Sequence, residues 1–275
     1  MTDLYAVFGN PIAHSKSPAI HADFAAATGQ ALRYESRLAA VDGFSRAISE
    51  FVAAGGRGAN VTVPLKEEAY RLSNRLSQRA ARAGAVNTLT FSQGEIVGDN
   101  TDGAGLVQDI EQNLDCPLAG KRILLLGAGG ASRGVIAPLL SCQPASLFIA
   151  NRSADKAVML ARRFVDLALI EAGSLGETAG KRFDLVINAT SASLAGESLS
   201  LPDSLYAEGA LAYDMMYGKG ETAFMLQARQ QGAARCADGL GMLAEQAAEA
   251  FFIWRGVRPE TATVLARLRA NLNGA

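Results

Sequence analysis

A short glycine turn directly after an apolar run constrains the fold of this chain more than any other feature. The run is Ile123-Leu-Leu-Leu126, the turn is Gly127-Ala-Gly-Gly130, and residues 131–140 after it are compatible with a helix. A buried strand, a tight glycine turn and a helix in this order present backbone N–H groups to the pyrophosphate of a dinucleotide. The sequence therefore predicts a βαβ unit that binds a dinucleotide cofactor.

The end of the next strand-like run indicates which dinucleotide is bound. The run Leu147-Phe-Ile-Ala150 ends in Asn151-Arg152-Ser153, and Lys156 follows three residues later. NAD-binding units usually carry an acidic residue about 20 residues after the glycines, where it holds the ribose 2′-hydroxyl. A guanidinium and a hydroxyl suit a 2′-phosphate instead, so we predict NADP as the cofactor. The alternative is that Arg152 is an ordinary solvated residue of a βα loop.

The composition excludes several classes of protein. The 275-residue chain is 49% hydrophobic and 19% charged, and it can bury one large core or two modest ones. Its formal net charge of −1 provides no basic field for nucleic acid or anionic lipid. It has no apolar run of about 18 residues, and residues 1–8 resemble a strand rather than a signal peptide. We therefore expect no nucleic-acid partner and no membrane contact.

Cysteine and histidine are too scarce and too scattered for a metal site. Cys116, Cys142 and Cys236 are far apart and odd in number, which favours reduced thiols and a cytoplasmic location. The only histidines are His14 and His21, so no ligand cluster with zinc spacing can be drawn. The expected chemistry therefore runs without a metal.

Strand-like and helix-like segments alternate along the chain, which predicts an α/β fold. In the first part we predict strands over 4–8, 33–38, 59–63, 85–91 and 95–97 and helices over 18–28, 43–54, 66–83 and 102–114. Pro117 and Gly120 follow the last of these helices, so a domain boundary is expected near residues 102–120. Beyond the glycine turn we predict strands over 147–150, 184–188 and 211–214 and helices over 242–254 and 259–272.

Small polar residues gather among glycines and strand ends in the first part of the chain. They are His14-Ser-Lys-Ser17, Asn60 with Thr62 on one face of a strand, Asn87-Thr88, and Asp99-Asn-Thr-Asp102. Each has an ordinary alternative as a cap or turn residue, such as Ser17 capping a helix that begins with a proline. Together with Lys66 they supply hydroxyls, amides, ammonium groups and carboxylates. That inventory suits a small polyhydroxy carboxylate.

A series of ordered segments carries a resemblance to a known family. The segments are Gly9–Pro18, Asn60–Lys66, Gly84–Thr88, Gly98–Gly103, Gly127–Arg133, Asn188–Ser191, Tyr213–Tyr217 and Asp238–Leu243. Through them nearly the whole chain resembles the shikimate dehydrogenase family of the biosynthetic, NADP-dependent type. The resemblance implies two domains, an α/β substrate domain and a Rossmann-type NADP-binding domain. It implies reversible NADPH-dependent reduction of 3-dehydroshikimate to shikimate, in the pathway to chorismate and the aromatic amino acids.

The resemblance also implies a domain division and site residues. Residues 1–102 would bind substrate, 103–238 would bind NADP, and 239–275 would return to the substrate domain. Substrate contacts would be Ser15, Ser17, Thr62, Lys66, Asn87, Asp102, Tyr217 and Gln246. Cofactor contacts would be Gly127, Ala128, Gly129, Gly130, Ala131, Asn151, Arg152, Ser153, Ala154, Asp155, Lys156, Met215 and Gly239. A monomer or homodimer is expected.

Three positions depart from the family pattern. Ser153 stands where relatives often carry threonine, and Lys156 stands where many carry arginine. These changes keep the hydroxyl and the charge, although lysine lacks the two-pronged guanidinium. Gln78 stands where some members place an acidic residue near the cofactor.

Lys66 and Asp102 are the only oppositely charged pair among the implied substrate contacts, so we assign them the proton chemistry. A carboxylate beside an ammonium favours the charged form of the lysine, whereas burial alone would disfavour it. Lys66 would be the acid–base residue, and Asp102 would orient it. The alternative is that Lys66 begins a helix with its ammonium in solvent.

Three other functions remain as alternatives. A relative that oxidises quinate with NAD would carry an acidic residue after the strand over 147–150, and none is present. A non-enzymatic sensor would lack Lys66 or Asp102, and both are present. A structural dinucleotide-binding subunit would not need the polar segments before residue 103.

Overall fold

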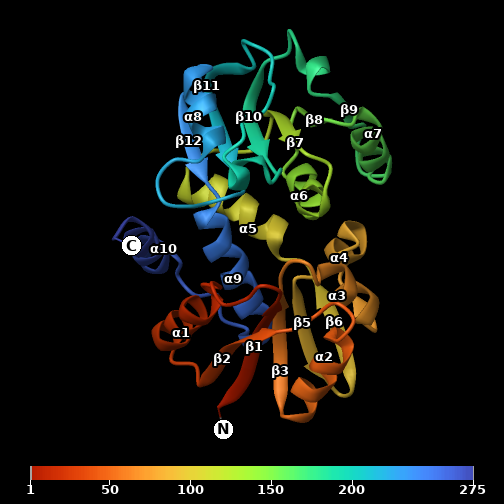
Figure 1. Cartoon of the computed structure of the whole chain (residues 1–275), viewed down its shortest axis with the longest axis vertical. Helices are drawn as coiled ribbons and strands as arrows, with labels where there is room; N and C mark the ends of the chain where they lie inside the picture. The colour runs from red at the N-terminus through yellow and green to blue at the C-terminus, as the bar shows by residue number, and fades with distance from the viewer. Residues whose placement is uncertain (1, 275) are drawn as a thin grey trace. The chain divides into compact units, whose positions relative to one another are not determined.

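The chain folds into two compact α/β units. The structure, a computed structural model, describes residues 2–274. One unit contains the residues up to Gly105 together with Ala244–Val264, and the other contains Leu106–Leu243 with the residues from Leu265 onward. Each unit has its own six-stranded sheet, which confirms the predicted fold class (Figure 1). The structure therefore groups residues 239–243 and those after 264 with the second unit, whereas the sequence analysis assigned all of 239–275 to the substrate domain.

The first unit is built on a mixed sheet with the strand order β2-β1-β3-β5-β6-β4. Strands β2 and β3 pair with β1 in parallel, while β5 is antiparallel to both β3 and β6. The strands are β1 (Asp3–Gly9), β2 (Leu32–Leu38), β3 (Gly56–Val61), β4 (Arg75–Leu76), β5 (Thr88–Ser92) and β6 (Glu95–Asp99). The helices are α1 (Ser17–Thr28), α2 (Phe44–Ala53), α3 (Lys66–Leu72), α4 (Gln78–Ala83), the start of α5 (Asp102–Gln108) and most of α9 (Leu240–Arg255).

Apolar side chains cover both faces of this sheet. On one face, Phe44, Ile48 and Phe51 of α2 are fully buried against Phe8 of β1, as their helical spacing predicts. The other face carries aromatic rings from α1, β1, β2 and α9, including Tyr5 stacked on Trp254 with ring centroids 4.7 Å apart. The unit therefore holds its site on a sheet that is packed from both sides.

The predicted helix over 66–83 is wrong, because a short strand interrupts it. α3 ends at Leu72, and Asn74 then exchanges two hydrogen bonds with Ile96 of β6, each 2.8 Å long. The backbone N–H of Ser77 bonds to Gly98, and the Ser77 hydroxyl caps α4 by accepting the N–H of Ala80 at 3.2 Å. Pairing with the edge of the sheet thus outweighed the helical pattern.

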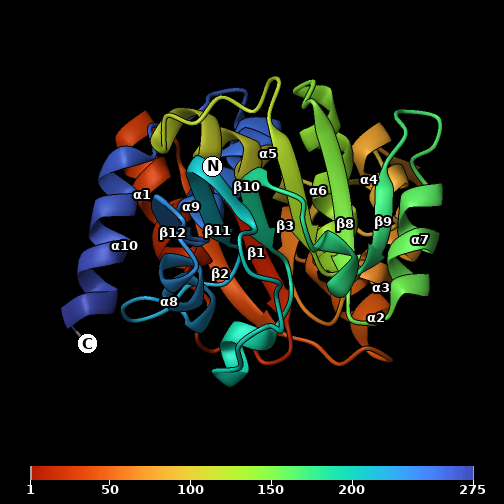
Figure 2. The same cartoon turned by 90° about the horizontal axis from the view of Figure 1, so that it is seen from above.

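The second unit is built on an all-parallel sheet with the order β12-β11-β10-β7-β8-β9 (Figure 2). Its strands are β7 (Arg122–Leu126), β8 (Ser146–Asn151), β9 (Glu171–Ser174), β10 (Phe183–Asn188), β11 (Tyr206–Asp214) and β12 (Arg235–Asp238). Its helices are α6 (Gly130–Ser141), α7 (Ala154–Arg162), α8 (Ala223–Gln230) and most of α10 (Ala262–Gly274). A π-helical turn η1 (Asp109–Asn113) continues α5, and two 3₁₀ turns are η2 (Gly176–Thr178) and η3 (Ala192–Ala195).

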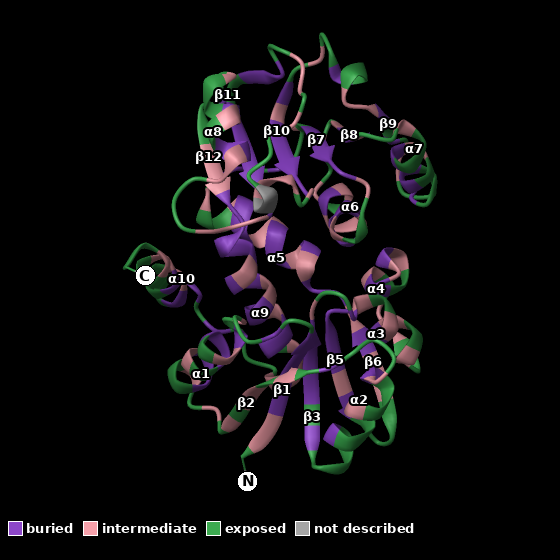
Figure 3. Cartoon of the chain, in the orientation of Figure 1, coloured by how far each residue is buried: buried purple, intermediate pink, exposed green. Residues whose placement is uncertain are grey.

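Burial on both faces explains why β7 is apolar from Ile123 to Leu126. Ile123 and Leu125 belong to a core shared with α6 and α7, while Leu124 and Leu126 belong to a core shared with α8. Figure 3 shows β7 and β10 coloured as buried. A parallel sheet covered on both sides requires such continuous apolar runs, and it is the Rossmann-like architecture expected of the second unit.

Candidate active site

The predicted acid–base pair forms at one edge of the first sheet. Because β5 reverses direction between them, β3 and β6 run the same way and their carboxyl ends lie at the same edge. Lys66 begins α3 shortly after β3, and Asp102 begins α5 shortly after β6. The Lys66 Nζ lies 2.6 Å from Asp102 Oδ2, with the two side chains 28% and 13% exposed. Lys66 is therefore held in an ion pair rather than solvated at a helix end.

Asn87 holds the other oxygen of the Asp102 carboxylate. The Asn87 Oδ1 accepts the backbone N–H of Thr101 at 2.8 Å, and a backbone N–H can only donate. The carboxamide is thereby oriented with Nδ2 toward Asp102 Oδ1, at 2.8 Å, and toward Gln246 Oε1, at 3.3 Å. Each carboxylate oxygen of Asp102 thus has its own donor, and the carboxylate is fixed in direction.

A second polar layer lies beneath Asn87. The buried Asn60 donates to the Asn87 carbonyl at 3.2 Å and to Thr88 Oγ1 at 3.1 Å. Its Oδ1 accepts the hydroxyl of Tyr34 at 2.7 Å. The Tyr34 ring stacks on His21 with centroids 4.2 Å apart. Sequence reasoning missed Tyr34, and its position on the face of β2 opposite Arg33 was the only signal for it.

The pKa values of this layer show that it is neutral. Burial raises the pKa of Tyr34 well above its ordinary value, since desolvation outweighs the effect of the Ser17 hydroxyl. Burial also lowers the pKa of His21 to about 3, and the neighbouring Asn60 side chain offsets only part of that effect. The ion pair of Lys66 and Asp102 thus lies next to a layer of neutral groups.

The remaining predicted substrate contacts fall in both units. Ser17 is buried as the first residue of α1 and makes no capping bond, so its role as an N-cap is wrong. Its backbone N–H bonds to the Ser15 hydroxyl at 3.3 Å. Thr62 follows β3 directly, where a Cβ on Gly9 would lie 2.5 Å from its methyl group. Tyr217 belongs to the second unit, on the segment after β11.

Asp99 anchors the turn that leads to Asp102. Burial alone would raise the pKa of Asp99, but hydrogen bonds from Arg79 and Ser77 outweigh it and hold that pKa below its ordinary value. Asp99 also accepts the N–H of Asn100 at 2.7 Å, and Asn100 Oδ1 accepts the N–H of Asp102 at 3.1 Å. The Asp102 backbone is therefore held as firmly as its side chain.

The glycine turn of the second unit suits a pyrophosphate. Gly127 adopts a φ of +107°, a conformation that favours glycine, and its N–H bonds to Ala150 at 2.8 Å. A Cβ on Gly129 would meet nothing within 4 Å, and Gly130 is exposed at the first turn of the 12-residue α6. Ala128 and Ala131, also predicted contacts, flank these glycines and are half-buried. Backbone N–H groups at a helix start that faces open space fit a phosphate group.

The end of β8 suits the 2′-phosphate of NADP. Arg152, Ser153 and Lys156 are all exposed, and within residues 2–274 neither cation is in an ion pair. Ser153 begins α7 without a side-chain capping bond. The predicted contacts Asn151, Ala154 and Asp155 lie on the same turn, where Asn151 Nδ2 donates to the Ser153 carbonyl at 3.0 Å. Two cations that form no ion pair in the described residues, together with a hydroxyl, fit a phosphate dianion.

The structure brings together two other predicted cofactor contacts. Met215 follows β11 and Gly239 follows β12, and a Cβ on Gly239 would collide with the Met215 carbonyl. Gly241 approaches the Asp109 carboxylate in the same way. These glycines are therefore required for close backbone approach within the second unit.

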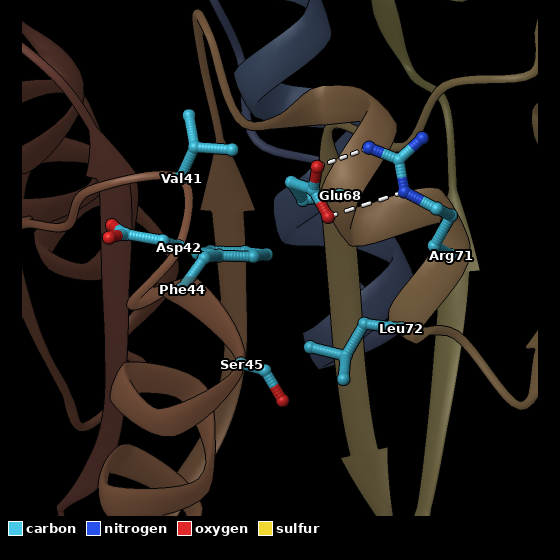
Figure 4. A pocket seen from close by; sticks show the side chains of 7 residues that line it. All are labelled: Val41, Asp42, Phe44, Ser45, Glu68, Arg71 and Leu72. Atoms are coloured by element: carbon cyan, nitrogen blue, oxygen red, sulfur yellow. Dashed lines mark hydrogen bonds and ion pairs between the residues drawn. The ribbon is translucent and has the colours of Figure 1, made fainter.

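Outside the predicted site, we searched the described chain for a pocket, a metal site and a membrane-spanning helix. A hollow of about 530 Å³ lies between the start of α2 and α3, where Glu68 and Arg71 form an ion pair. Figure 4 shows the side chains that line it. No predicted site residue lines it. Among residues 2–274, no group of three or more His, Cys, Asp or Glu is arranged to hold a metal ion. No helix in that part of the chain is long and apolar enough to cross a membrane.

Comparisons of the sequence with family models and with curated proteins all match the same family. Family models described as the shikimate dehydrogenase substrate binding domain, shikimate / quinate 5-dehydrogenase and the shikimate 5'-dehydrogenase C-terminal domain match residues 7–89, 108–195 and 239–269. The shikimate dehydrogenase (NADP(+)) of Dechloromonas aromatica strain RCB is 75% identical over 272 residues, which cover 99% of each chain.

Two solved structures share the fold over nearly their whole length. The Ael1 enzyme of Pseudomonas putida has a TM-score of 0.93 and 48% identity, covering 97% of this chain and 98% of its own. The shikimate 5-dehydrogenase of Thermus thermophilus, solved with NADP(H) and shikimate, has a TM-score of 0.88 and 33% identity, covering 98% of this chain and 100% of its own.

Proposed function

The chain belongs to the shikimate dehydrogenase family, and on that premise we propose that Lys66 and Asp102 carry the proton chemistry of its active site. Its activity is the reversible NADPH-dependent reduction of 3-dehydroshikimate to shikimate, on the pathway to chorismate and the aromatic amino acids. The bound cofactor supplies the hydride that reduces the ketone carbon. The protein must supply the proton.

The observation that carries the proposal is the 2.6 Å contact between Lys66 Nζ and Asp102 Oδ2. When the ketone is reduced its oxygen gains a proton, and in the reverse direction the hydroxyl loses one. An ammonium donates that proton, and the neutral amine takes it back. Asp102 holds the Nζ in place, and Asn87 in turn fixes the Asp102 carboxylate. The lysine is therefore preorganised for a substrate oxygen placed beside it.

The other assigned residues divide between substrate and cofactor. Polyol and carboxylate groups would be held by Ser15, Ser17, Thr62, Asn87, Gln246 and Tyr217. The open glycine turn at the start of α6 would hold the pyrophosphate, and Arg152, Ser153 and Lys156 would hold the 2′-phosphate. Met215 and Gly239 would line the nicotinamide end. Support comes from the open glycine turn and from the two cations that have no ion-pair partner within residues 2–274.

We propose further that residues 1–102 form the substrate-binding domain, 103–238 the NADP-binding domain, and 239–275 a return to the first. Support for that return comes from Ala244–Val264, the part of the segment that groups with the first unit. A cytoplasmic location is supported by the three cysteines, which are all free. A monomer or a homodimer would suffice, because each unit has its own core. Sedimentation of the purified protein would decide between the two oligomeric states.

Steady-state kinetics of two substitutions test the proton assignment. Lys66→Ala should lower turnover by about 10²–10⁴-fold, the usual contribution of a general acid–base group. Asp102→Asn should also lower turnover strongly, and the two losses should not add, because the residues act as a unit.

Lys181→Ala is the matched control, since it breaks a lysine–carboxylate pair with Glu171 that is largely exposed. Its turnover should match the wild type. If Lys66→Ala kept near-normal turnover with only a raised KM, Lys66 would be a binding residue and water would supply the proton.

A matrix of two cofactors and two substrates tests the function itself. We expect turnover to be highest with NADP and shikimate, because no carboxylate stands at the strand end that would hold the ribose of NAD. Preferred turnover of quinate with NAD would overturn this assignment.

A further inference from the structure

Asp214 is a buried carboxylate with no role in the chemistry described so far. It ends β11 and is 0% exposed. Within residues 2–274 it accepts hydrogen bonds from four donors, although it is assigned no contact with substrate or cofactor. Its Oδ1 accepts Asn188 Nδ2 at 3.1 Å and the N–H of Met216 at 3.0 Å. Its Oδ2 accepts the hydroxyls of Ser193 and Thr222, each at 2.6 Å.

These donors come from two segments that follow neighbouring strands. Asn188 ends β10 and is the register partner of Asp214. Ser193 lies on the segment after β10, while Met216 and Thr222 lie on the segment after β11. The carboxylate therefore ties the first turns beyond both strand ends together. Charge-assisted bonds of this kind are stronger than bonds between neutral groups.

The segment after β10 is also in contact with the glycine turn. Asn188 Oδ1 accepts both the N–H of Thr190, at 3.1 Å, and its hydroxyl, at 2.7 Å. A Cβ on Gly127 would lie 3.1 Å from the Thr190 methyl group, so the two backbones are as close as glycine allows. The N–H of Met215 bonds to the Asn188 carbonyl at 2.9 Å. Hydrogen bonds through Asn188 thus join Met215 to Thr190, which packs beside the pyrophosphate turn.

We infer that Asp214 is a positioning residue, whose carboxylate holds the segments after β10 and β11 in the arrangement that receives the nicotinamide end of the cofactor. The inference rests on the proposed function, which places Met215 at that end and Tyr217 against the substrate. Asp214 touches neither substrate nor cofactor in this role. It acts through the backbone between Met216 and Thr222, the two residues on either side of Tyr217 that its carboxylate binds.

The pattern of donors requires a carboxylate at this position rather than an amide. All four groups donate to Asp214, and an asparagine would place an NH₂ against two of them. Against Asn188 Nδ2 and the Met216 N–H, which can only donate, the NH₂ would repel. It would therefore face the hydroxyls, and Thr222 Oγ1 already accepts the N–H of Met225 at 3.2 Å. Asp214→Asn should thus keep the shape and the amide contacts while loosening the hydroxyl contacts.

Kinetics and fragment binding of Asp214→Asn test the inference. We expect kcat to fall about tenfold or more, the effect of losing a hydrogen bond to a charged group. Binding of adenosine 2′,5′-bisphosphate, which carries the 2′-phosphate but no nicotinamide, should be unchanged by titration calorimetry. A purely structural role would weaken both. Equal losses in turnover and fragment affinity, or unchanged kcat and KM, would overturn the inference.

Substitutions of the residues that donate to Asp214 test the same inference if Asp214→Asn does not fold. Thr222→Val loses the hydroxyl and should lower kcat, while Thr222→Ser keeps it and should restore kcat. Ser193→Ala removes the bond to the other segment without removing a helix cap, and it should also lower kcat. Equal kcat in Thr222→Val and Thr222→Ser would contradict the inference.

The wild-type protein separates this inference from the proposed function. If the wild type did not oxidise shikimate with NADP, the proposed function would fail. If the wild type did so and Asp214→Asn matched it, the inference alone would fail.

Discussion

At the scale of single residues, the active site depends on the direction of one carboxamide. The N–H of Thr101 reaches Asn87 Oδ1, so Asn87 Nδ2 must face Asp102. Asp102 then keeps one oxygen for Lys66. A backbone donor supplied by the fold thus decides the geometry of the proposed catalytic pair.

Arg152 should decide the choice of cofactor. It is exposed at the end of β8 and has no ion-pair partner within residues 2–274, so its charge is available to a 2′-phosphate. Arg152→Ala should raise the KM for NADP roughly ten- to hundredfold, since charge-assisted hydrogen bonds contribute about 1.5–3 kcal/mol each. The KM for NAD should change far less. Arg162→Ala, at the far end of α7, is the control, and equal weakening of both cofactors would refute the 2′-phosphate assignment.

His21 should make the folded state sensitive to acid. Its pKa is about 3 in the folded chain and about 6.5 in an unfolded one. Between these values the unfolded chain binds the extra proton, so the free energy of unfolding must fall as pH drops from about 6.5 toward 3. Each pKa unit corresponds to about 1.4 kcal/mol, so the loss reaches several kcal/mol at the acid end.

His21→Phe should remove this part of the acid sensitivity. Within residues 2–274 neither imidazole nitrogen has a hydrogen-bond partner, so a phenyl ring stacked on Tyr34 breaks no bond. Urea unfolding at pH values from 4 to 8 would measure the difference. The variant should match the wild type near neutral pH and lose less stability below about pH 6. Parallel pH profiles would show that His21 does not titrate on unfolding.

At the scale of elements, the sequence predicted those with strong periodicity and missed those defined by their neighbours. α2 was predicted because Phe44, Ile48 and Phe51 repeat at helical spacing, and β7 because its apolar run is buried on both sides. β4 was missed because only its pairing with β6 makes it a strand. The short edge strands β9 and β12 were also missed, as were the helices α7 and α8.

The site was predictable where motifs mark it and not where packing builds it. Lys66 and Asp102 stand out as charged residues among glycines and strand ends, and the structure brings them into contact. Tyr34 lies on an ordinary strand, and Asp214 looks like any polar residue after a strand. Their roles come from partners that lie 26 residues away in each case, at Asn60 and Asn188. No local pattern carries that information.

Gly105 should control how closely α5 and α9 approach in the first unit. A Cβ on Gly105 would lie 2.6 Å from the backbone N of Gln246 and 2.7 Å from its Cβ. Gly105→Ala should therefore push Gln246 away, lowering stability by about 1–3 kcal/mol. It should also raise the KM for shikimate. Gly176→Ala is the control, because its Cβ would find its nearest neighbour, Ser174 Oγ, at 3.9 Å. Equal thermal midpoints for the two variants would contradict this account.

At the scale of the whole molecule, the chain passes between its two units within helices rather than within loops. The divisions fall between Gly105 and Leu106, between Leu243 and Ala244, and between Val264 and Leu265. These positions lie inside α5, α9 and α10. Unfolding one unit alone would break the intrahelical hydrogen bonds that cross the division in each helix. The two units should therefore unfold in a single transition.

The only tryptophan makes that coupling measurable, because Trp254 lies in the first unit and NADP is assigned to the second. At 100 times its Kd, NADP should add about 2.7 kcal/mol to the free energy of unfolding. If the units unfold together, Trp254 fluorescence and circular dichroism should report the same urea midpoint. NADP should then shift both midpoints by the same amount. NAD at the same concentration is the control and should shift both midpoints less. A Trp254 midpoint that NADP leaves unchanged, beside a circular dichroism curve that becomes biphasic, would show that the helices do not couple the units.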